Sequence, residues 1–239
     1  MTALKIQDLK VGYKRNEVIH GIDIRVDAGE RVALLGANGA GKSTILKTIS
    51  GLLNPTVGSI TFDGDDITGA KAAAVVEKGI IHVPEGRRVF PALTVEENLR
   101  VANYRKGSDN LVAGLNDAYA AFPDLANRKD QPAGLLSGGQ QQMLSLSRAI
   151  IARPRLLLID EMSLGLAPVL VKEFYNTLGS LFSEDVTLLL VEQNAGLALA
   201  HCSRFYVIRN GEVALEGNSE DYRDDPTKLQ SAYLGIETS

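Results

Sequence analysis

Cysteine and clustered histidine are nearly missing from this sequence. A single cysteine, Cys202, stands among 239 residues, which excludes an intrachain disulfide and fits a reducing compartment. We expect Cys202 to pack in the core as a small apolar side chain. The three histidines, His20, His82 and His201, lack the spacing of metal ligands, so the sequence does not support a zinc site.

Long apolar runs and an excess of positive charge are missing too. No stretch approaches the roughly 18 apolar residues of a membrane span, and the runs 156–159 and 186–191 are only strand-length. Residues 1–9 mix Lys, Gln and Asp with apolar residues and lack a signal-peptide core. The net charge of −4 argues against a nucleic-acid partner bound through a basic face. We therefore expect a cytosolic protein that binds no nucleic acid.

A glycine-rich turn between an apolar strand and a helix is present instead. Gly36, Gly41, Lys42 and Ser43 have the G-x4-G-K-S spacing of the phosphate-binding P-loop. Glycines let backbone N–H groups point at phosphate oxygens, and the helix adds its free N–H groups and the positive end of its dipole. The predicted ATP-binding residues of this turn are Gly36, Ala37, Asn38, Gly39, Ala40, Gly41, Lys42, Ser43 and Thr44. A purely structural glycine turn is the alternative.

Two of these side chains have separate expected tasks. Lys42 can reach the β and γ phosphates as a point charge, and the Ser43 hydroxyl can ligate Mg²⁺. Upstream, Tyr13 has two interpretations: a ring that stacks on adenine, or a half-buried aromatic residue of a sheet.

The remaining pattern predicts two kinds of segment. Alternating or continuous apolar residues predict strands at 4–6, 9–11, 22–26, 31–35, 59–62, 80–83, 155–161, 186–191, 205–209 and 212–215. Helices are expected from the P-loop to Gly51, from the Thr94–Glu97 capping box toward Arg105, over 111–122 and over 139–152, with one or two short ones from Ser219 on.

The order of these segments indicates an α/β fold. The first strands form a small antiparallel sheet, the later buried strands form a mostly parallel sheet, and the helices form an insert between two of its strands. We expect a single domain over residues 1–239, with a core at about 1–86 and 154–239 and a helical subdomain at about 87–153.

Two acidic residues end the buried strand 155–161. Ligands of parallel sheets bind at the carboxyl ends of the strands, so Asp160 and Glu161 are placed to act on a nucleotide. Because adjacent strand residues point in opposite directions, the two carboxylates suit different roles. We expect Asp160 to support Mg²⁺ and Glu161 to polarise the attacking water as general base.

A second glycine-rich turn precedes the helix at 139–152. Ser137, Gly138, Gly139 and Gln140 combine a hydroxyl, two glycines and a helix N-terminus, which is again suited to an anion. Because the P-loop already occupies the nucleotide's phosphates from one side, we expect this turn to contact an ATP held by another subunit. An ordinary N-cap serine followed by a glycine turn is the alternative.

The chain carries a P-loop, the LSGGQ run 136–140 and the Asp160-Glu161 pair in this order, with Tyr13 upstream of the P-loop. Through these motifs it resembles the nucleotide-binding subunits of ABC transporters over its whole length. Segments 83–91, 93–99, 163–168 and 191–194 look like the smaller, LivF-type ATPase of branched-chain amino acid importers.

Several partners and a fold are implied by the resemblance. The fold would be a P-loop NTPase with a RecA-like core. The chain would bind ATP and Mg²⁺ in a head-to-tail dimer with a second ABC ATPase, the same or a paralogous one, so that ATP lies between one P-loop and the other LSGGQ. Two transmembrane permease subunits and a solute-binding protein would complete a transporter. The chain would lie peripherally on the cytosolic face of the cell (inner) membrane.

Four positions depart from the general ABC pattern. Glu85 stands where most members have a glutamine near Mg²⁺ and the γ-phosphate, and Gln193 stands where most have a histidine facing that phosphate. Both substitutions fit the LivF branch, so we keep Glu85 as a candidate at the Mg²⁺ site and Gln193 as a catalytic candidate beside Glu161. Ala167 replaces an interface aspartate, and Met162 replaces a proline.

Three functions compete. The first is the ATPase subunit of an importer, in which Phe90 and Pro91 either border the groove for a permease helix or pack internally. The second is a soluble ABC ATPase acting on a protein assembly, for which tandem domains or basic inserts would be expected. The third is an ATP sensor without hydrolysis, against which the presence of Lys42, Asp160 and Glu161 counts.

Overall fold

The computed structural model describes residues 1–14, 16–103, 108–163, 165–181, 186–224 and 229. Contacts divide the chain into two compact units, the first comprising 1–82, 155–161 and 184–239 and the second 83–154 and 162–183. Each unit is described by itself. Three parts of the expectations lie outside the described residues: Arg105, Leu164 and the chain beyond Asp224 apart from Leu229.

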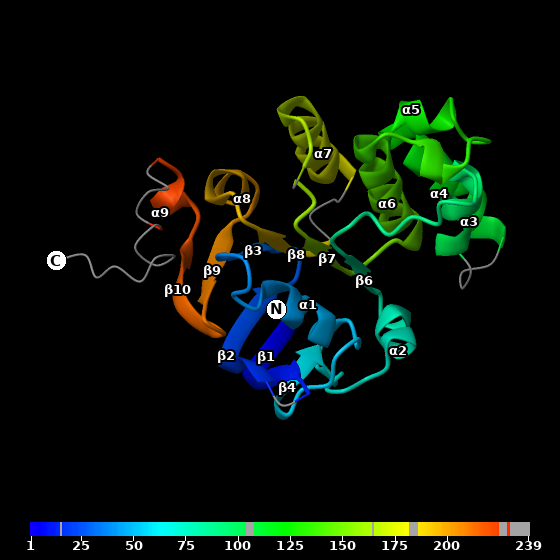
Figure 1. Cartoon of the computed structure of the whole chain (residues 1–239). Coiled ribbons are helices and arrows are strands. Elements are labelled where there is room, and N and C mark those ends of the chain that lie inside the picture. Colours follow the sequence, from blue (N-terminus) through cyan, green and yellow to red (C-terminus); the bar gives the residue numbers. More distant parts are fainter. Residues whose placement is uncertain (15, 104–107, 164, 182–185, 225–228, 230–239) are drawn as a thin grey trace. The chain divides into compact units, whose positions relative to one another are not determined.

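The first unit begins with a four-stranded antiparallel sheet. Its strands are β1 (Thr2–Tyr13), β2 (Asn16–Asp27), β4 (Val57–Phe62) and β5 (Asp65–Asp66), in the order β2-β1-β4-β5. In the central strand, Ile6 pairs with Ile24 on one side and Ile60 on the other, and all three side chains are buried. The alternating pattern therefore predicted this sheet correctly (Figure 1).

The second sheet of the first unit has six strands, and one of them, β3, leads into the P-loop. Its order is β10-β9-β3-β8-β7-β6. The strands are β3 (Arg31–Leu35), β6 (Ile80–Val83), β7 (Leu156–Asp160), β8 (Thr187–Glu192), β9 (Arg204–Arg209) and β10 (Glu212–Asn218). β3 pairs in parallel with β8 and β9, and β7 pairs in parallel with β8. Every residue of β7 and β8 is buried, as expected for central parallel strands.

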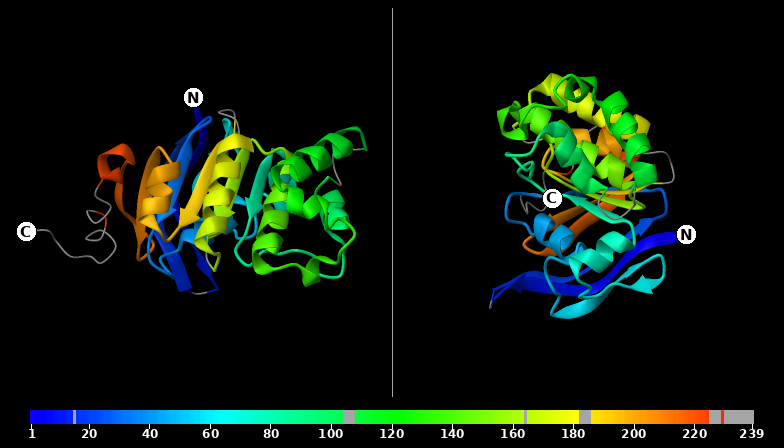
Figure 2. Two further views of the ribbon diagram at one scale, coloured as in Figure 1. Left: turned by 90° about the horizontal axis from the view of Figure 1, so that it is seen from above. Right: turned by 90° about the vertical axis from the view of Figure 1, so that its right-hand side faces the viewer.

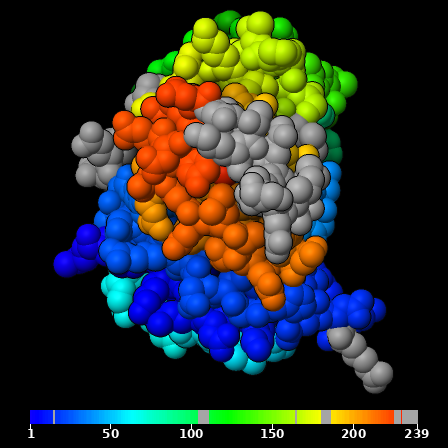
Figure 3. Space-filling model, turned by 90° about the vertical axis from the view of Figure 1, so that its left-hand side faces the viewer, coloured from blue at the N-terminus to red at the C-terminus, as the bar shows by residue number. Residues whose placement is uncertain are grey.

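An antiparallel hairpin, β9 and β10, forms one edge of this sheet. β9 and β10 are joined by Asn210 and Gly211, both with positive φ (50° and 77°), which confirms the predicted two-residue turn. β10 is the outermost strand and reaches the surface of the unit (Figure 3).

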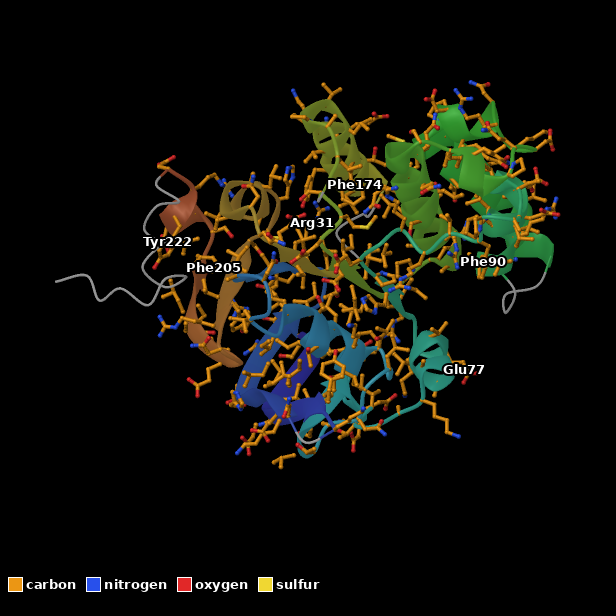
Figure 4. The ribbon with its side chains drawn as sticks, viewed as in Figure 1. Arg31, Glu77, Phe90, Phe174, Phe205 and Tyr222 are labelled. Carbon is orange, nitrogen blue, oxygen red and sulfur yellow. The ribbon has the colours of Figure 1, made fainter. Side chains whose placement is uncertain are left out.

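The described part of the first unit contains the helices α1 (Lys42–Ile49), α2 (Ala72–Glu77), α8 (Ala195–His201) and α9 (Glu220–Arg223). α1 ends before Gly51, as predicted, and Gly51 has a φ of 71°. α8 packs against β3, β8 and β9 (Figure 2). α9 is held by Tyr222, whose ring meets Phe205 edge to face at 5.1 Å (Figure 4).

Cys202, directly after α8, is buried as expected. Burial raises the pKa of its thiol to about 12. The thiol therefore stays protonated at neutral pH and acts as a small apolar side chain.

The second unit is helical in its described part. It contains α3 (Val95–Ala102), α4 (Ser108–Ala121), α5 (Pro123–Ala126), a 3-10 turn η1 (Ala133–Leu135), α6 (Gly138–Ala152) and α7 (Pro168–Leu181). α6 is the centre of the group, in contact with α3, α4, α5 and α7 (Figure 1). The predicted capping box starts α3: the Thr94 hydroxyl accepts from the Glu97 N–H, and the Glu97 carboxylate accepts from the Thr94 N–H.

No helix within the described ranges combines the length and the apolar character that crossing a bilayer requires.

Candidate functional site

The P-loop connects the end of β3 to the start of α1. Three of its glycines, Gly36, Gly39 and Gly41, have positive φ values of 150°, 80° and 109°. A Cβ atom at Gly36 would overlap the carbonyl oxygen of Ile208, and one at Gly41 would overlap the Ile19 side chain. Glycine is therefore required here both for the backbone conformation and for close packing.

The same turn fits a phosphate group. The first N–H groups of α1 have no partner within the helix, and its N-cap residue, Gly41, contributes no side-chain cap. Residues 37–39 are exposed, so the mouth of the turn is open to solvent. Inward N–H groups and the positive end of the helix dipole at an open turn favour an anion.

Lys42 is the buried cation of the turn. Its side chain is 3% exposed, and Nζ donates to the carbonyl oxygens of Gly36 (2.9 Å) and Ala37 (3.0 Å). Nζ also lies 3.1 Å from Oε1 of Glu161. The three partners match the three N–H groups of the ammonium, which offsets the desolvation cost of burying the charge.

The side chains of Asp160 and Glu161 have different partners, as expected, but strand alternation is not the reason. The strand was expected to reach Glu161, whereas β7 ends at Asp160, and Glu161 has a φ of 48° with its N–H bonded to Val191 O at 3.0 Å. Asp160 Oδ1 accepts a hydrogen bond from Ser43 Oγ at 3.0 Å, while Glu161 pairs with Lys42. The left-handed residue, not strand alternation, separates the two carboxylates.

Gln193 completes the cluster. It follows β8, and its Nε2 donates to Oε2 of Glu161 at 2.6 Å. Both carboxylate oxygens of Glu161 are thus engaged, one by Lys42 and one by Gln193. The first unit therefore brings together five candidates from α1, β7 and the chain after β8: Lys42, Ser43, Asp160, Glu161 and Gln193. Their catalytic roles stay predictions.

Ser43 and Asp160 form the part of the cluster that fits a hard cation. Their oxygens are 3.0 Å apart. Nowhere in the described ranges do three His, Cys, Asp or Glu side chains converge on a metal position. Mg²⁺ usually takes one or two protein oxygens and fills its octahedron with phosphate oxygens and waters. The pair therefore fits a magnesium ion that arrives with a nucleotide.

Tyr13 lies at the end of β1. Tyr13 is 44% exposed, and Nζ of Lys47 lies 5.9 Å from the centroid of its ring. An exposed ring face suits stacking on a base. The adenine-stacking role stays a prediction.

In the second unit, the turn Ser137–Gln140 caps α6. Ser137 Oγ accepts from the Gln140 N–H at 3.3 Å, and Gln140 Oε1 accepts from the Ser137 N–H at 3.0 Å. The N-cap interpretation thus describes the contacts within this chain. Ser137 is exposed, and a Cβ at Gly138 or at Gly139 would meet the end of the Arg87 or the Leu170 side chain, which would then have to shift. Contact with a neighbour's ATP stays a prediction.

The segment that begins at Glu85 is unusual in its backbone. Glu85 is exposed, and Gly86, Arg87 and Arg88 follow with φ values of 84°, 66° and 46°. Arg148 Nη1 donates to the Arg88 carbonyl at 2.8 Å, and burial lowers the pKa of the Arg148 guanidinium. The role of Glu85 toward Mg²⁺ stays a prediction.

Phe90 is partly exposed and partly packed against its own unit, and a role at a groove for a permease helix stays a prediction. Its residue is 43% exposed, while the Arg148 guanidinium lies 5.0 Å from its ring centroid (Figure 4). The backbone of Phe90 is fixed by Asn98, which accepts from its N–H at 2.8 Å and donates to its carbonyl at 3.0 Å.

Met162, for which the sequence offered no explanation, is fully buried. Gln142 of α6 donates from Nε2 to the Met162 carbonyl at 3.0 Å, and the same nitrogen lies 2.7 Å from Met162 Sδ. Sequence reasoning missed Gln142; its only signal is an amide on a helix face that is otherwise apolar or small.

Comparison with known proteins identifies relatives along nearly the whole chain. Residues 19–163 match the sequence model of the family described as ABC transporter. The high-affinity branched-chain amino acid transport ATP-binding protein BraG of Pseudomonas aeruginosa is 40% identical over 232 residues, which cover 97% of this chain and 99% of BraG. The probable branched-chain amino acid transport ATP-binding protein LivF of Archaeoglobus fulgidus is 32% identical over 234 residues, covering 98% and 99%.

The fold has solved counterparts as well. An ATP-binding cassette of an ABC transporter in its ADP conformation is 26% identical and matches with a TM-score of 0.83, over 98% of this chain and 99% of that one.

Proposed function

This chain is an ATP-binding protein of the ABC transporter family, and from that premise we propose that it hydrolyses ATP to drive import of branched-chain amino acids or related small solutes. The observation that carries the proposal is the meeting of Lys42, Glu161 and Gln193 at the P-loop. The cargo is proposed because BraG and LivF are both named as branched-chain amino acid transport ATP-binding proteins.

In the proposed reaction, the γ-phosphate of ATP draws the ammonium of Lys42 away from Glu161. Oε1 of Glu161 is then free to accept a hydrogen bond from a water, while Gln193 continues to hold Oε2. Glu161 takes a proton as that water attacks the γ-phosphorus, the bond to the β–γ bridging oxygen breaks, and ADP and phosphate result. Lys42 and the N–H groups of the turn stabilise the charge on the phosphates.

A magnesium ion would be held by Ser43 and Asp160, with Glu85 as a further candidate. When bound, Mg²⁺ supplies neutralisation of phosphate charge. Ser43 and Asp160 also orient each other through their hydrogen bond, which fixes the first turn of α1 beside the end of β7.

The proposed assembly extends beyond this chain. We infer one nucleotide-binding domain over residues 1–239, with core about 1–86 and 154–239 and helical subdomain about 87–153. It pairs head to tail with a second ABC ATPase, the same or paralogous, whose ATP contacts Ser137, Gly138, Gly139 and Gln140. Two transmembrane permeases and a solute-binding protein complete the importer, with this chain peripheral on the cytosolic face of the cell membrane.

Substitution of the general base tests the reaction. Glu161→Gln should lower steady-state phosphate release roughly 100- to 10,000-fold while ATP binding persists, because the amide keeps the size but cannot accept the proton. Glu212→Gln, which changes an exposed carboxylate on β10, is the matched control and should keep full activity. Full ATPase activity of Glu161→Gln in the purified complex would contradict the base assignment.

Two further measurements test whether the chain assembles with permeases and which solute is transported. The chain should sediment with membranes only when the permeases are present, and branched-chain amino acids with their binding protein should stimulate the ATPase of the purified complex. Cytosolic fractionation irrespective of the permeases favours the alternative of a soluble ABC ATPase on a protein assembly. Absence of phosphate release favours the ATP-sensing module.

A further inference from the structure

Three consecutive glutamines stand in the first turns of α6, and each has a different partner. Gln140 closes the capping box with Ser137. Gln141 donates to the Ala133 carbonyl at 3.1 Å. Gln142 points inward and is 5% exposed. The chain thus provides chemically identical neighbours against which the buried amide can be compared.

The amide of Gln142 holds the residue that follows Glu161. Its Nε2 donates to the carbonyl oxygen of Met162 at 3.0 Å, and Met162 has no exposed surface. A buried carbonyl depends on its donor, because water cannot replace a bond that is lost inside the protein. Gln142 therefore fixes the main chain one residue after the candidate base.

On its other side, Glu161 is fixed by β8. Its N–H donates to Val191 O at 3.0 Å, and its φ of 48° is in the left-handed region. A side-chain-bearing residue keeps that conformation only where its surroundings determine it. The main chain at Glu161 and Met162 is thus held by two hydrogen bonds, one from Glu161 to Val191 of β8 and one from Gln142 of α6 to Met162.

We propose that Gln142 is a positioning residue for Glu161, acting through the Met162 carbonyl. The inference rests on the proposed function, in which Glu161 is the base and the turn Ser137–Gln140 contacts the partner's ATP. Gln142 follows that turn directly on α6. Gln142 therefore holds the main chain of the residue that follows the proposed base.

The first test separates orientation from binding. In the full-length chain, purified with the subunits that accompany it, Gln142→Leu removes the amide at similar volume, and Gln142→Met is the second variant should the branched side chain not fold. We expect kcat for ATP hydrolysis to fall roughly 10- to 100-fold with KM for ATP changed less than about twofold. Gln141→Leu, which loses an amide bonded to Ala133 instead, should keep kcat within about twofold.

The second test asks whether Gln142 acts through Glu161. In a Glu161→Gln background, single-turnover hydrolysis should fall less than about twofold on adding Gln142→Leu, because the group being oriented is already gone. Equal losses in both backgrounds, a KM that rises as far as kcat falls, or an unchanged kcat would overturn the inference. Full activity of Glu161→Gln alone would instead overturn the proposed base.

Discussion

Glu161 is the residue at which backbone conformation and chemistry depend on each other. A left-handed φ costs a residue with a side chain about 1–2 kcal/mol. Lys42 and Gln193 engage its carboxylate and Val191 accepts from its N–H, so three bonds offset that cost. Without the turn at Glu161, the carboxylate would continue the alternation of β7 and would lie away from Lys42.

The glycines of the P-loop differ in how well they tolerate substitution by alanine. Gly36→Ala should destabilise the protein by roughly 2–4 kcal/mol, because the new Cβ overlaps the Ile208 carbonyl and main chain must move. Gly39→Ala meets open space, so only its φ of 80° opposes the change, at about 1 kcal/mol. Urea unfolding without nucleotide measures both; equal losses would show that packing at Gly36 is relaxed.

A partly buried histidine makes stability depend on pH. Burial lowers the pKa of His82 from 6.5 to about 4, and its Nδ1 lies 3.1 Å from Ser50 Oγ. Between these values the unfolded chain binds a proton that the folded chain does not, so His82 lowers stability as pH falls from about 6.5 to 4. The full effect is roughly 3–4 kcal/mol.

Unfolding free energies at several pH values between 7 and 4 test this. His82→Gln should flatten the slope relative to the unchanged protein. An identical slope in the protein with and without His82 would refute the linkage.

At the scale of elements, Asn98 attaches the segment 90–94 to α3. It is fully buried, and its amide donates to the carbonyls of Phe90, Leu93 and Thr94 at 3.0, 3.2 and 2.9 Å. Asn98→Ala should cost roughly 3 kcal/mol, because it leaves partly buried main-chain groups of Phe90 without partners.

The helix cap beside it provides the comparison. Thr94→Ala removes the cap of the same helix, and a capping hydroxyl is worth about 1 kcal/mol. Thermal and urea unfolding should therefore rank Asn98→Ala well below Thr94→Ala in stability. The opposite ranking would mean that the cap, not the buried amide, holds this segment.

Elements with strong local signals could be predicted from the sequence. The continuous apolar runs of β7 and β8, the Asn210-Gly211 turn and the Thr94 capping box all depend on neighbours in the chain, and the structure confirms them. α7 and α8 were not predicted, although each carries a local start signal: α7 begins at Pro168, and the side chain of Asn194 caps α8.

The features of the candidate site also fall into those that the sequence predicts and those that it does not. The P-loop, Asp160 and Glu161 follow from spacing alone, because phosphate chemistry demands fixed residue types at fixed intervals. The left-handed turn at Glu161 and the bond from Gln142 to Met162 could not be foreseen, since both depend on atoms 20 or more residues apart. Sequence thus indicates which residues take part, and tertiary contacts decide how they are oriented.

At the scale of the whole molecule, nucleotide binding should raise the free energy of unfolding. A ligand that binds only the folded chain stabilises it by about 2.7 kcal/mol at a hundred times its Kd. Glu161→Gln with saturating Mg-ATP should therefore melt several degrees higher than without it, because bound ATP is not consumed.

The same measurement on Lys42→Ala decides whether the P-loop is the site. Removing the ammonium deletes the charge proposed to meet the β and γ phosphates, so Mg-ATP should no longer raise the melting temperature. Lys71→Ala, which changes an exposed lysine at the start of α2, should keep the full ATP-dependent rise. If Lys42→Ala is stabilised by ATP as strongly as Lys71→Ala, the nucleotide is held elsewhere, and the proposed transfer of Lys42 from Glu161 to phosphate is wrong.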